Sequence, residues 1–251
     1  MAVNQQEIKS IQDLLEVLGK INPDSKQVWF RGQARSTWNL LPFYMRQNNM
    51  PSESTFLKKF KQSAAMLINT NTIPKSDFDW LFLMQHYGVP TRLLDWSESP
   101  LVALYFAVES LATHEGEDAA LWVLFPTELN MLSRIRNKNE HDYIPSFEDV
   151  ELTNYSIDSL KSTPNTELLP VATIATRNNA RIQAQHGVFT IHHLDNVAID
   201  DIEPFEHVIK ITIPNDSKEI IKKQLELLGY TKFQLFPELA SIGDIIKESI
   251  Q

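Results

Sequence analysis

The chain has 251 residues, a formal net charge of −9 at pH 7 and no cysteine, and 43% of its residues are hydrophobic. This length allows one large domain or two small ones, each with a substantial core. The absence of cysteine excludes disulfides, thiolate nucleophiles and zinc–thiolate sites. The acidic balance argues against broad, non-specific nucleic-acid binding, because phosphate neutralisation needs clustered Lys and Arg.

The sequence has no feature of a membrane or exported protein. It contains no run of about 18 apolar residues, so no membrane partner is expected. Residues 1–7 lack a basic segment followed by an apolar one, and no signal peptide is therefore expected. These patterns favour a soluble, cytoplasmic protein.

The first half of the sequence predicts helices that alternate with short strands. Ser76 opens a capping-box pattern, and Gly88 with Pro90 ends the helix that follows it. Residues 101–107 are apolar all round, which is typical of a buried helix. The expected helices span residues 6–20, 53–69, 76–87 and 99–107, and the expected strands span 28–30 and 91–96.

The second half is richer in strands. Residues 127–170 are polar and lack periodicity, which predicts a long irregular insertion. Because strands and helices are interspersed without regular βαβ alternation, the sequence favours an α+β fold. The expected strands span residues 119–125, 171–175, 188–191 and 208–214, and helices or helical turns are expected at 181–187, 217–228 and 239–250.

Two segments, residues 29–33 and 85–97, place charged side chains inside apolar runs. A charge in such surroundings is expensive unless it has a partner or a ligand. The guanidinium of Arg31 suits a pyrophosphate, and Gly32 would let a ligand approach the backbone closely. A buried ion pair between Arg31 and Asp95 explains the same pattern, so both interpretations stay open.

Other residues of the second segment also have two interpretations. Arg92 and Asp95 are three residues apart and should lie on opposite faces of a regular strand. Trp96 offers a stacking surface, although a core position is favoured. For His86, a hydrogen bond to nearby backbone is favoured over a chemical role. No pair of histidines has the spacing of a helical metal motif, so no metal is expected.

These motifs resemble the FRG domain family, which takes its name from a Phe-Arg-Gly motif. The resemblance extends over nearly the whole chain and implies a single domain over residues 1–251, with a helical insert at about 53–88 and the irregular insertion at about 127–170. The residues that carry it are Phe30-Arg31-Gly32, Trp38-x-Leu40-x-Pro42, Gln85 to Trp96, Pro100 to Ala107, Gln185-x-Gly187-x-Phe189 and Leu235 to Leu239.

The order of features also resembles the ADP-ribosyltransferase fold. This second resemblance implies an α+β fold whose mixed or antiparallel sheet is split, with flanking helices, and it implies NAD as the ligand. The counterparts are Arg31-Gly32, Asp95 to Ser97, Val102 to Ala107, Ala120 to Phe125 and Gln183-Ala184-Gln185.

The transferase resemblance implies a set of site residues. NAD or a related nucleotide would contact the residues at eight positions, namely Arg31, Gly32, Gln33, Thr91, Arg92, Trp96, Ser97 and Gln183. The candidate catalytic residues are Asp95, Gln185 and His86. ADP-ribose would pass to a protein or nucleic-acid acceptor, or NAD would be hydrolysed.

The chain departs from the transferase pattern at the late catalytic position. Gln183 and Gln185 stand where a carboxylate is needed to stabilise positive charge on the ribose, and an amide cannot neutralise a cation. Either Asp95 or Glu98 supplies that charge, or the nucleotide is bound without turnover. A noncatalytic nucleotide- or nucleic-acid-binding module and a structural interaction domain are the alternatives.

Overall fold

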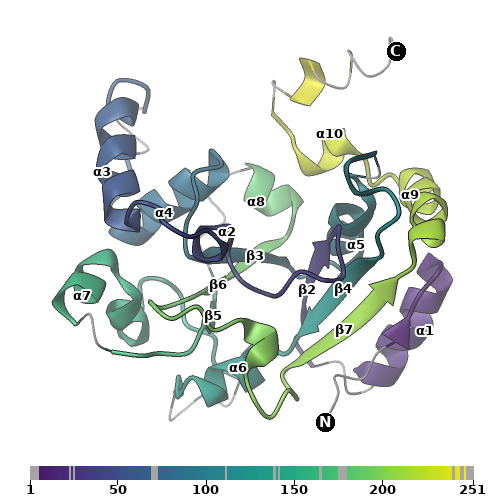
Figure 1. Ribbon diagram of the computed structural model, residues 1–251, viewed down its shortest axis with the longest axis horizontal. Coiled ribbons are helices and arrows are strands. Elements are labelled where there is room, and N and C mark those ends of the chain that lie inside the picture. The colour runs from purple at the N-terminus through teal and green to yellow at the C-terminus, as the bar shows by residue number, and fades with distance from the viewer. Residues whose placement is uncertain are drawn as a thin grey trace.

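A computed structural model describes residues 6–22, 24, 26–68, 73–110, 112–137, 140, 142–163, 166–174, 180–238, 241–243 and 246. Its strands are β1 (Gln6–Glu7), β2 (Trp29–Gln33), β3 (Leu93–Ser97), β4 (Ala119–Leu124), β5 (Val171–Thr173), β6 (Gly187–Ile191) and β7 (Val208–Ile213). They form one sheet in the order β1-β7-β4-β2-β3-β6-β5 (Figure 1). Among these described strands β1 and β7 are parallel and the other neighbours antiparallel.

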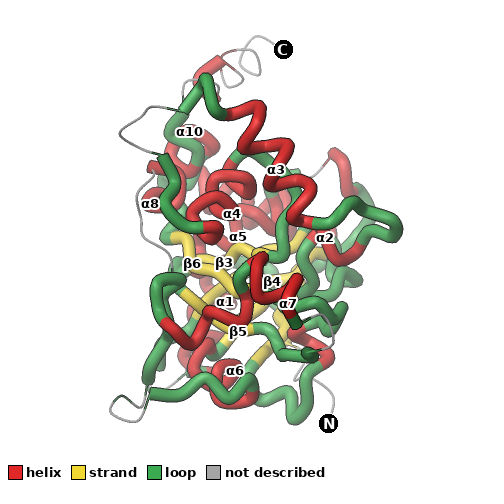
Figure 2. The backbone as a smooth tube through the Cα atoms, turned by 90° about the vertical axis from the view of Figure 1, so that its left-hand side faces the viewer, coloured by secondary structure: helices red, strands yellow, loops and turns green. Residues whose placement is uncertain are grey.

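Helices flank this mixed sheet, which confirms the expected α+β class. The α-helices are α1 (Ile11–Ile21), α2 (Phe43–Arg46), α3 (Glu53–Ala64), α4 (Asp77–His86), α5 (Pro100–Val108), α6 (Pro126–Leu132), α7 (Ile157–Ser162), α8 (Ala180–Ala184), α9 (Lys218–Leu227) and α10 (Lys232–Leu235). Figure 2 shows α3, α4 and α8 gathered at one end of the strands. None of the described helices is both long and apolar enough to cross a membrane.

The core has three parts. On one face of the sheet, α1, α5 and α9 pack on the half that contains β2, β4 and β7. On the same face α4 packs on β3 and β6, together with α3 and α7. The opposite face is covered in part by α6 and contains the buried indoles of Trp29, Trp96 and Trp122. Two groups of helices therefore lie side by side on one face, over different halves of the sheet.

Serine caps explain where the main helices begin. The side chains of Ser10, Ser52, Ser76 and Ser99 each accept a hydrogen bond from a backbone N–H of the following turn. At Ser76 both bonds of the predicted capping box are present. The helix predicted from residue 6 instead begins at Ile11, because Gln6 and Glu7 pair with β7 before Ser10 caps the helix.

The prediction of an irregular insertion at residues 127–170 is wrong in part. The described part of this range contains regular elements. They are α6 from its second residue onward, α7 and the 3-10 helix Val150–Tyr155. These elements are short and are stabilised by tertiary burial of residues such as Leu129 and Tyr155, so no long apolar period marks them. Most of the helix predicted at 239–250 lies outside the described residues.

The sheet is divided between β2 and β3. Strand β2 pairs with β4 at five consecutive residues, but its pairing with β3 is confined to Phe30 and Ser97. Beyond this pair the two strands diverge within what remains a single seven-stranded mixed sheet. The divergence lies between the helix group of α5 and that of α4, and it forms the floor of the cavity described next.

Candidate functional site

A cavity of about 370 Å³ lies where β2 and β3 diverge, and α4, α5 and α8 contribute to its wall. This volume is within the range of small-molecule sites. The wall contains three arginines, Arg31, Arg46 and Arg181, and two carboxylates, Asp95 and Glu109. Positive charges outnumber negative ones among these five groups, so the cavity is suited to a ligand with a negatively charged group.

Arg31 connects the diverging strands through its side chain. Its Nη1 donates a hydrogen bond to the backbone carbonyl of Asp95 at 2.5 Å, in place of the expected ion pair with the carboxylate. Its Nε is buried without a hydrogen-bond partner among the described residues. Burial lowers the pKa of Arg31 to about 10, an effect that Asp95 opposes and Arg46 reinforces. The side chain is therefore a poorly solvated cation at neutral pH.

Gly32 lines the cavity and also has a packing role. A Cβ atom placed on it would lie 1.9 Å from the carbonyl oxygen of Ala103 in α5. Strand β2 and α5 can approach this closely because residue 32 has no side chain. The second half of the Arg-Gly motif thus positions the helix that forms one wall of the cavity.

Asp95 presents an exposed carboxylate at the cavity wall. Gln85, in the last turn of α4, donates a hydrogen bond from Nε2 to Asp95 Oδ2 at 2.8 Å. The Oε1 of Gln85 accepts one from the hydroxyl of Thr91 at 2.5 Å. Thr91, expected to contact a nucleotide, is buried and does not line the cavity. Gln85 was missed as a site residue, although it opens the second motif segment.

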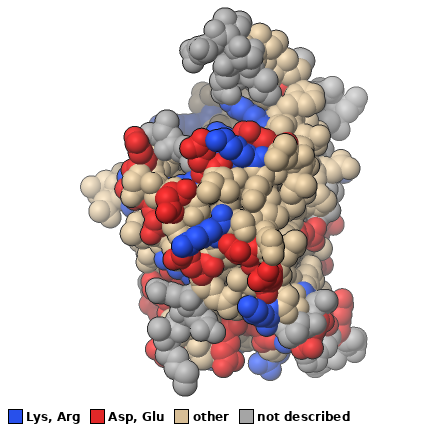
Figure 3. Space-filling view, turned by 90° about the vertical axis from the view of Figure 1, so that its right-hand side faces the viewer, with Lys and Arg blue, Asp and Glu red and all other residues tan. Residues whose placement is uncertain are grey.

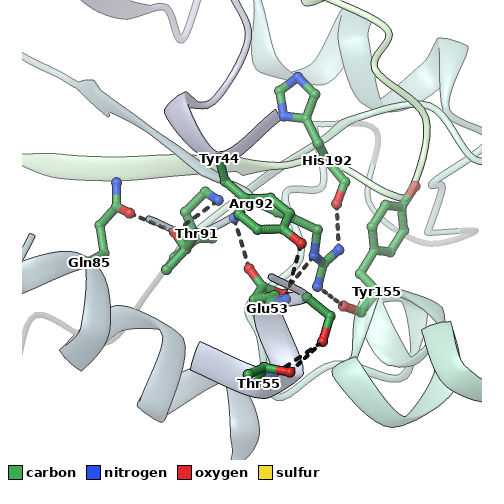
Figure 4. Close-up of polar contacts among 10 residues, drawn as sticks. Tyr44, Glu53, Thr55, Gln85, Thr91, Arg92, Tyr155 and His192 are labelled. Atoms are coloured by element: carbon green, nitrogen blue, oxygen red, sulfur yellow. Dashed lines mark hydrogen bonds and ion pairs between the residues drawn. The ribbon is translucent and has the colours of Figure 1, made fainter. Parts of the chain in front are cut away.

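Arg92, expected to contact a nucleotide, is placed by the structure among internal partners and away from the cavity wall. It is 2% exposed, and its Nε lies 2.8 Å from the Glu53 carboxylate (Figure 4). Its Nη1 and Nη2 donate hydrogen bonds to the backbone carbonyls of His192 and Tyr155 at 2.6 and 2.9 Å. The guanidinium therefore joins α3 to the start of β3 and the end of β6, and it does not reach the cavity.

Trp96, Gln33 and Ser97 border the cavity but use their polar atoms for internal contacts. The indole of Trp96 is buried and donates to Thr190 at 3.0 Å, which confirms the core interpretation. The hydroxyl of Ser97 donates to the carbonyl of Gln185 at 2.7 Å. Gln33 donates a hydrogen bond to the backbone carbonyl of Asn39, in the loop that follows β2, and accepts one from the indole of Trp122.

Gln183 and Gln185 stand where the transferase comparison expects a carboxylate, and they lie differently with respect to the cavity. Gln183 is exposed and outside the cavity wall, contrary to its expected role. Gln185 lines the cavity and donates to the carbonyl of Leu235 at 3.0 Å. Glu98 is absent from the wall, whereas Glu109, at the end of α5, is present. Burial raises the pKa of Glu109, and this residue was missed because it follows an apolar helix and belongs to no motif.

His86 lies on the wall beside a carboxylate. Its Nε2 is 3.6 Å from Glu238 Oε1, and its backbone carbonyl accepts a hydrogen bond from Arg181 at 3.4 Å. Burial lowers the pKa of His86, and Glu238 opposes this shift. The imidazole is accordingly neutral at pH 7.

Several aromatic residues that sequence reasoning missed border the same cavity. The guanidinium of Arg46 lies 5.5 Å from the ring centroid of Trp38, and the ring of His114 meets that indole edge-on at 5.4 Å. Phe106 of α5 lines the cavity as well. Trp38 belongs to the Trp-x-Leu-x-Pro pattern after β2, and that pattern was the available signal.

Comparison with known proteins gives one match. Residues 26–116 match the family model of the FRG domain, so this part of the chain is an FRG domain. The matched region contains β2, α4, β3 and α5, the elements that meet at the cavity. No curated protein and no solved structure matches the chain. The likeness of the remaining residues to the family stays a prediction.

Proposed function

We propose that the chain binds a nucleotide with a diphosphate group, NAD or a close relative, in the cavity between α4 and α5. Transfer of ADP-ribose to a macromolecule, or hydrolysis of NAD, is the chemistry that such a complex would support. The proposal draws on the volume, charge and aromatic lining of the cavity, and on the order of motifs along the chain.

The observation that carries the proposal is the pair of guanidiniums, Arg31 and Arg46, at one cavity. The charge of Arg46 lowers the pKa of Arg31, so the two cations disfavour each other when no anion is present. A diphosphate between them would neutralise both charges, and a planar guanidinium can donate paired hydrogen bonds to it. Trp38 and Phe106 provide apolar rings for a base in the same cavity.

The carboxylate of Asp95 at the cavity wall supports the proposed transfer of ADP-ribose or hydrolysis of NAD. Breaking the bond between nicotinamide and ribose leaves positive charge on the sugar, which a nearby carboxylate stabilises. Asp95 is the exposed carboxylate of the wall, and it takes the place of the glutamate that the transferase comparison expects near Gln185. In this scheme Arg31 binds phosphate and Asp95 faces the ribose.

The test is a titration of the protein with ADP-ribose, NAD and AMP, followed by thermal unfolding. A ligand at 100 times its dissociation constant should stabilise the protein by about 2.7 kcal/mol. Arg31→Lys keeps the charge but loses the planar pair of donors, so its affinity for ADP-ribose should fall about 10- to 100-fold. Release of nicotinamide from NAD, measured in parallel, separates turnover from binding.

Arg136→Lys is the matched control. Arg136 is exposed and absent from the cavity wall, so its substitution should leave nucleotide affinity unchanged. If none of the three nucleotides stabilises the protein, or if Arg31→Lys binds them as tightly as the unaltered chain, the proposal is wrong. Stabilisation without nicotinamide release would favour a noncatalytic nucleotide-binding module.

Nucleic acid is the less favoured ligand. The chain has a net charge of −9, and on the face drawn in Figure 3 Lys and Arg lie among Asp and Glu rather than in one basic stripe. The three arginines line one cavity of about 370 Å³, a volume that suits a small ligand better than a duplex.

A further inference from the structure

Three hydrogen bonds lead from the backbone of β3 to the carboxylate of Asp95, and their direction is fixed. The backbone N–H of Leu93 can only donate, and it donates to Thr91 Oγ1 at 3.2 Å. The hydroxyl proton of Thr91 is then directed to Gln85 Oε1. This contact turns the NH₂ group of Gln85 towards Asp95 Oδ2, which can only accept.

The buried end of this chain of hydrogen bonds is rigid. Thr91 is 2% exposed, and its neighbour Arg92 is held by Glu53 through both its backbone N–H and its Nε (Figure 4). Gln85 is half-buried in the last turn of α4, between Thr91 and Asp95. The exposed end is the carboxylate, so an internal network determines the orientation of a group on the cavity wall.

From this arrangement, which rests on the proposed function, we propose that Gln85 and Thr91 are positioning residues that make the site selective for a ligand with a positively charged ring. The amide of Gln85 holds Asp95 as a hydrogen-bond acceptor and orients its carboxylate at the cavity wall. A positively charged ring, such as the pyridinium of oxidised NAD, would be attracted to that carboxylate, whereas NADH and ADP-ribose lack the positive charge.

The arginines and Asp95 would therefore recognise different parts of one ligand. Arg31 and Arg46 would bind the diphosphate, which NAD, NADH and ADP-ribose share. Asp95 would distinguish among these three molecules by the charge of the part beyond the ribose. Disrupting Thr91 or Gln85 should lower affinity for oxidised NAD while affinity for ADP-ribose is kept.

The test compares dissociation constants of oxidised NAD, NADH and ADP-ribose, measured by calorimetry on the full chain. Thr91→Val removes the hydroxyl at nearly constant volume, and it should lower the preference for oxidised NAD over ADP-ribose about three- to tenfold. Thr91→Ser retains the hydroxyl and should restore the preference. If Thr91→Val folds poorly, Gln85→Met tests the same chain of hydrogen bonds, because Gln85 is only half-buried.

The outcomes separate this inference from the proposed function. If the unaltered chain binds none of the three molecules, the proposed function is wrong and the inference is overturned with it. If the chain binds them and Arg31→Lys weakens all three, but Thr91→Val and Gln85→Met keep the preference for oxidised NAD, the positioning role alone is overturned. Equal loss of affinity for all three ligands in Thr91→Val would also contradict it.

Discussion

Arg31 and Arg92 show how the surroundings of a guanidinium decide its role. Each follows or precedes apolar residues in the sequence, and each is charged. Arg92 has acceptors at Nε, Nη1 and Nη2, whereas the buried Nε of Arg31 has none among the described residues. Arg92 is therefore saturated by the protein, whereas Arg31 lines the cavity and is only partly satisfied by protein acceptors.

Removing the partner of Arg92 should strongly destabilise the fold. Glu53→Gln leaves a buried guanidinium without its counter-charge, and the free energy of unfolding should fall by about 3–5 kcal/mol in urea denaturation. Asp158→Asn is the control, because the ion pair of Asp158 with Lys161 is exposed and its loss should leave the free energy of unfolding nearly unchanged. A loss below 1 kcal/mol for Glu53→Gln would contradict the structural role given to Arg92.

At this scale the sequence predicted part of the site. It singled out Arg31 and Asp95 because charges in apolar runs are conspicuous. It did not separate Arg92 from Arg31, because the partner of Arg92 is 39 residues away in sequence and looks like an ordinary first-turn glutamate. Glu109 gave no local signal at all.

At the scale of elements, the contact between β2 and α5 depends on a missing side chain. Gly32→Ala would place a Cβ atom 1.9 Å from the Ala103 carbonyl oxygen, and the obstacle is backbone that cannot rotate away. We expect the free energy of unfolding to fall by about 1–3 kcal/mol or more, as for other overpacked cores. Urea denaturation measures the change directly.

Gly19→Ala is the matched control for that substitution. Gly19 lies within α1 and has no left-handed φ angle, and a Cβ atom added to it would meet no other atom within 4 Å. Alanine there should stabilise the protein by about 0.5–1 kcal/mol, because glycine is the poorer helix former. Destabilisation by both substitutions to a similar extent would show that steric conflict with α5 is not the cause.

Elements with local signals were predicted well, and elements that depend on tertiary contacts were not. Ser76 and Ser99 mark their helices because an N-cap is a property of the adjacent turn. By contrast α7 and the 3-10 helix Val150–Tyr155 are too short to show a period, and burial of Leu152 and Tyr155 stabilises them. The pairing of β1 with β7, which delays the start of α1, likewise depends on residues about 200 positions apart.

At the scale of the whole molecule, buried histidines should make stability depend on pH. Burial lowers the pKa of His192 from 6.5 to about 3, and Arg92 adds to this shift. Burial also lowers the pKa of His193 and of His207. In each case the unfolded chain binds a proton that the folded chain does not, so stability is complete above about pH 6.5 and falls as the pH decreases.

The effect of His192 is measurable by urea denaturation at pH 7 and pH 5. One such proton changes the free energy of unfolding by about 1.4 kcal/mol per pH unit, which amounts to about 2 kcal/mol between pH 6.5 and 5. In His192→Leu this contribution should disappear, and the difference between the two pH values should shrink accordingly. An unchanged difference would show that His192 is not the group that takes up the proton.

The limited backbone pairing between β2 and β3 has a mechanical consequence. With backbone pairing confined to Phe30 and Ser97, the sub-sheet of β1, β7, β4 and β2 shares few hydrogen bonds with that of β3, β6 and β5. The side chain of Arg31 adds one more. A ligand held by Arg31 on one side and Asp95 on the other would restrict movement of the two sub-sheets against each other. Occupancy of the cavity would then be reported by slower amide exchange along both strands that border it.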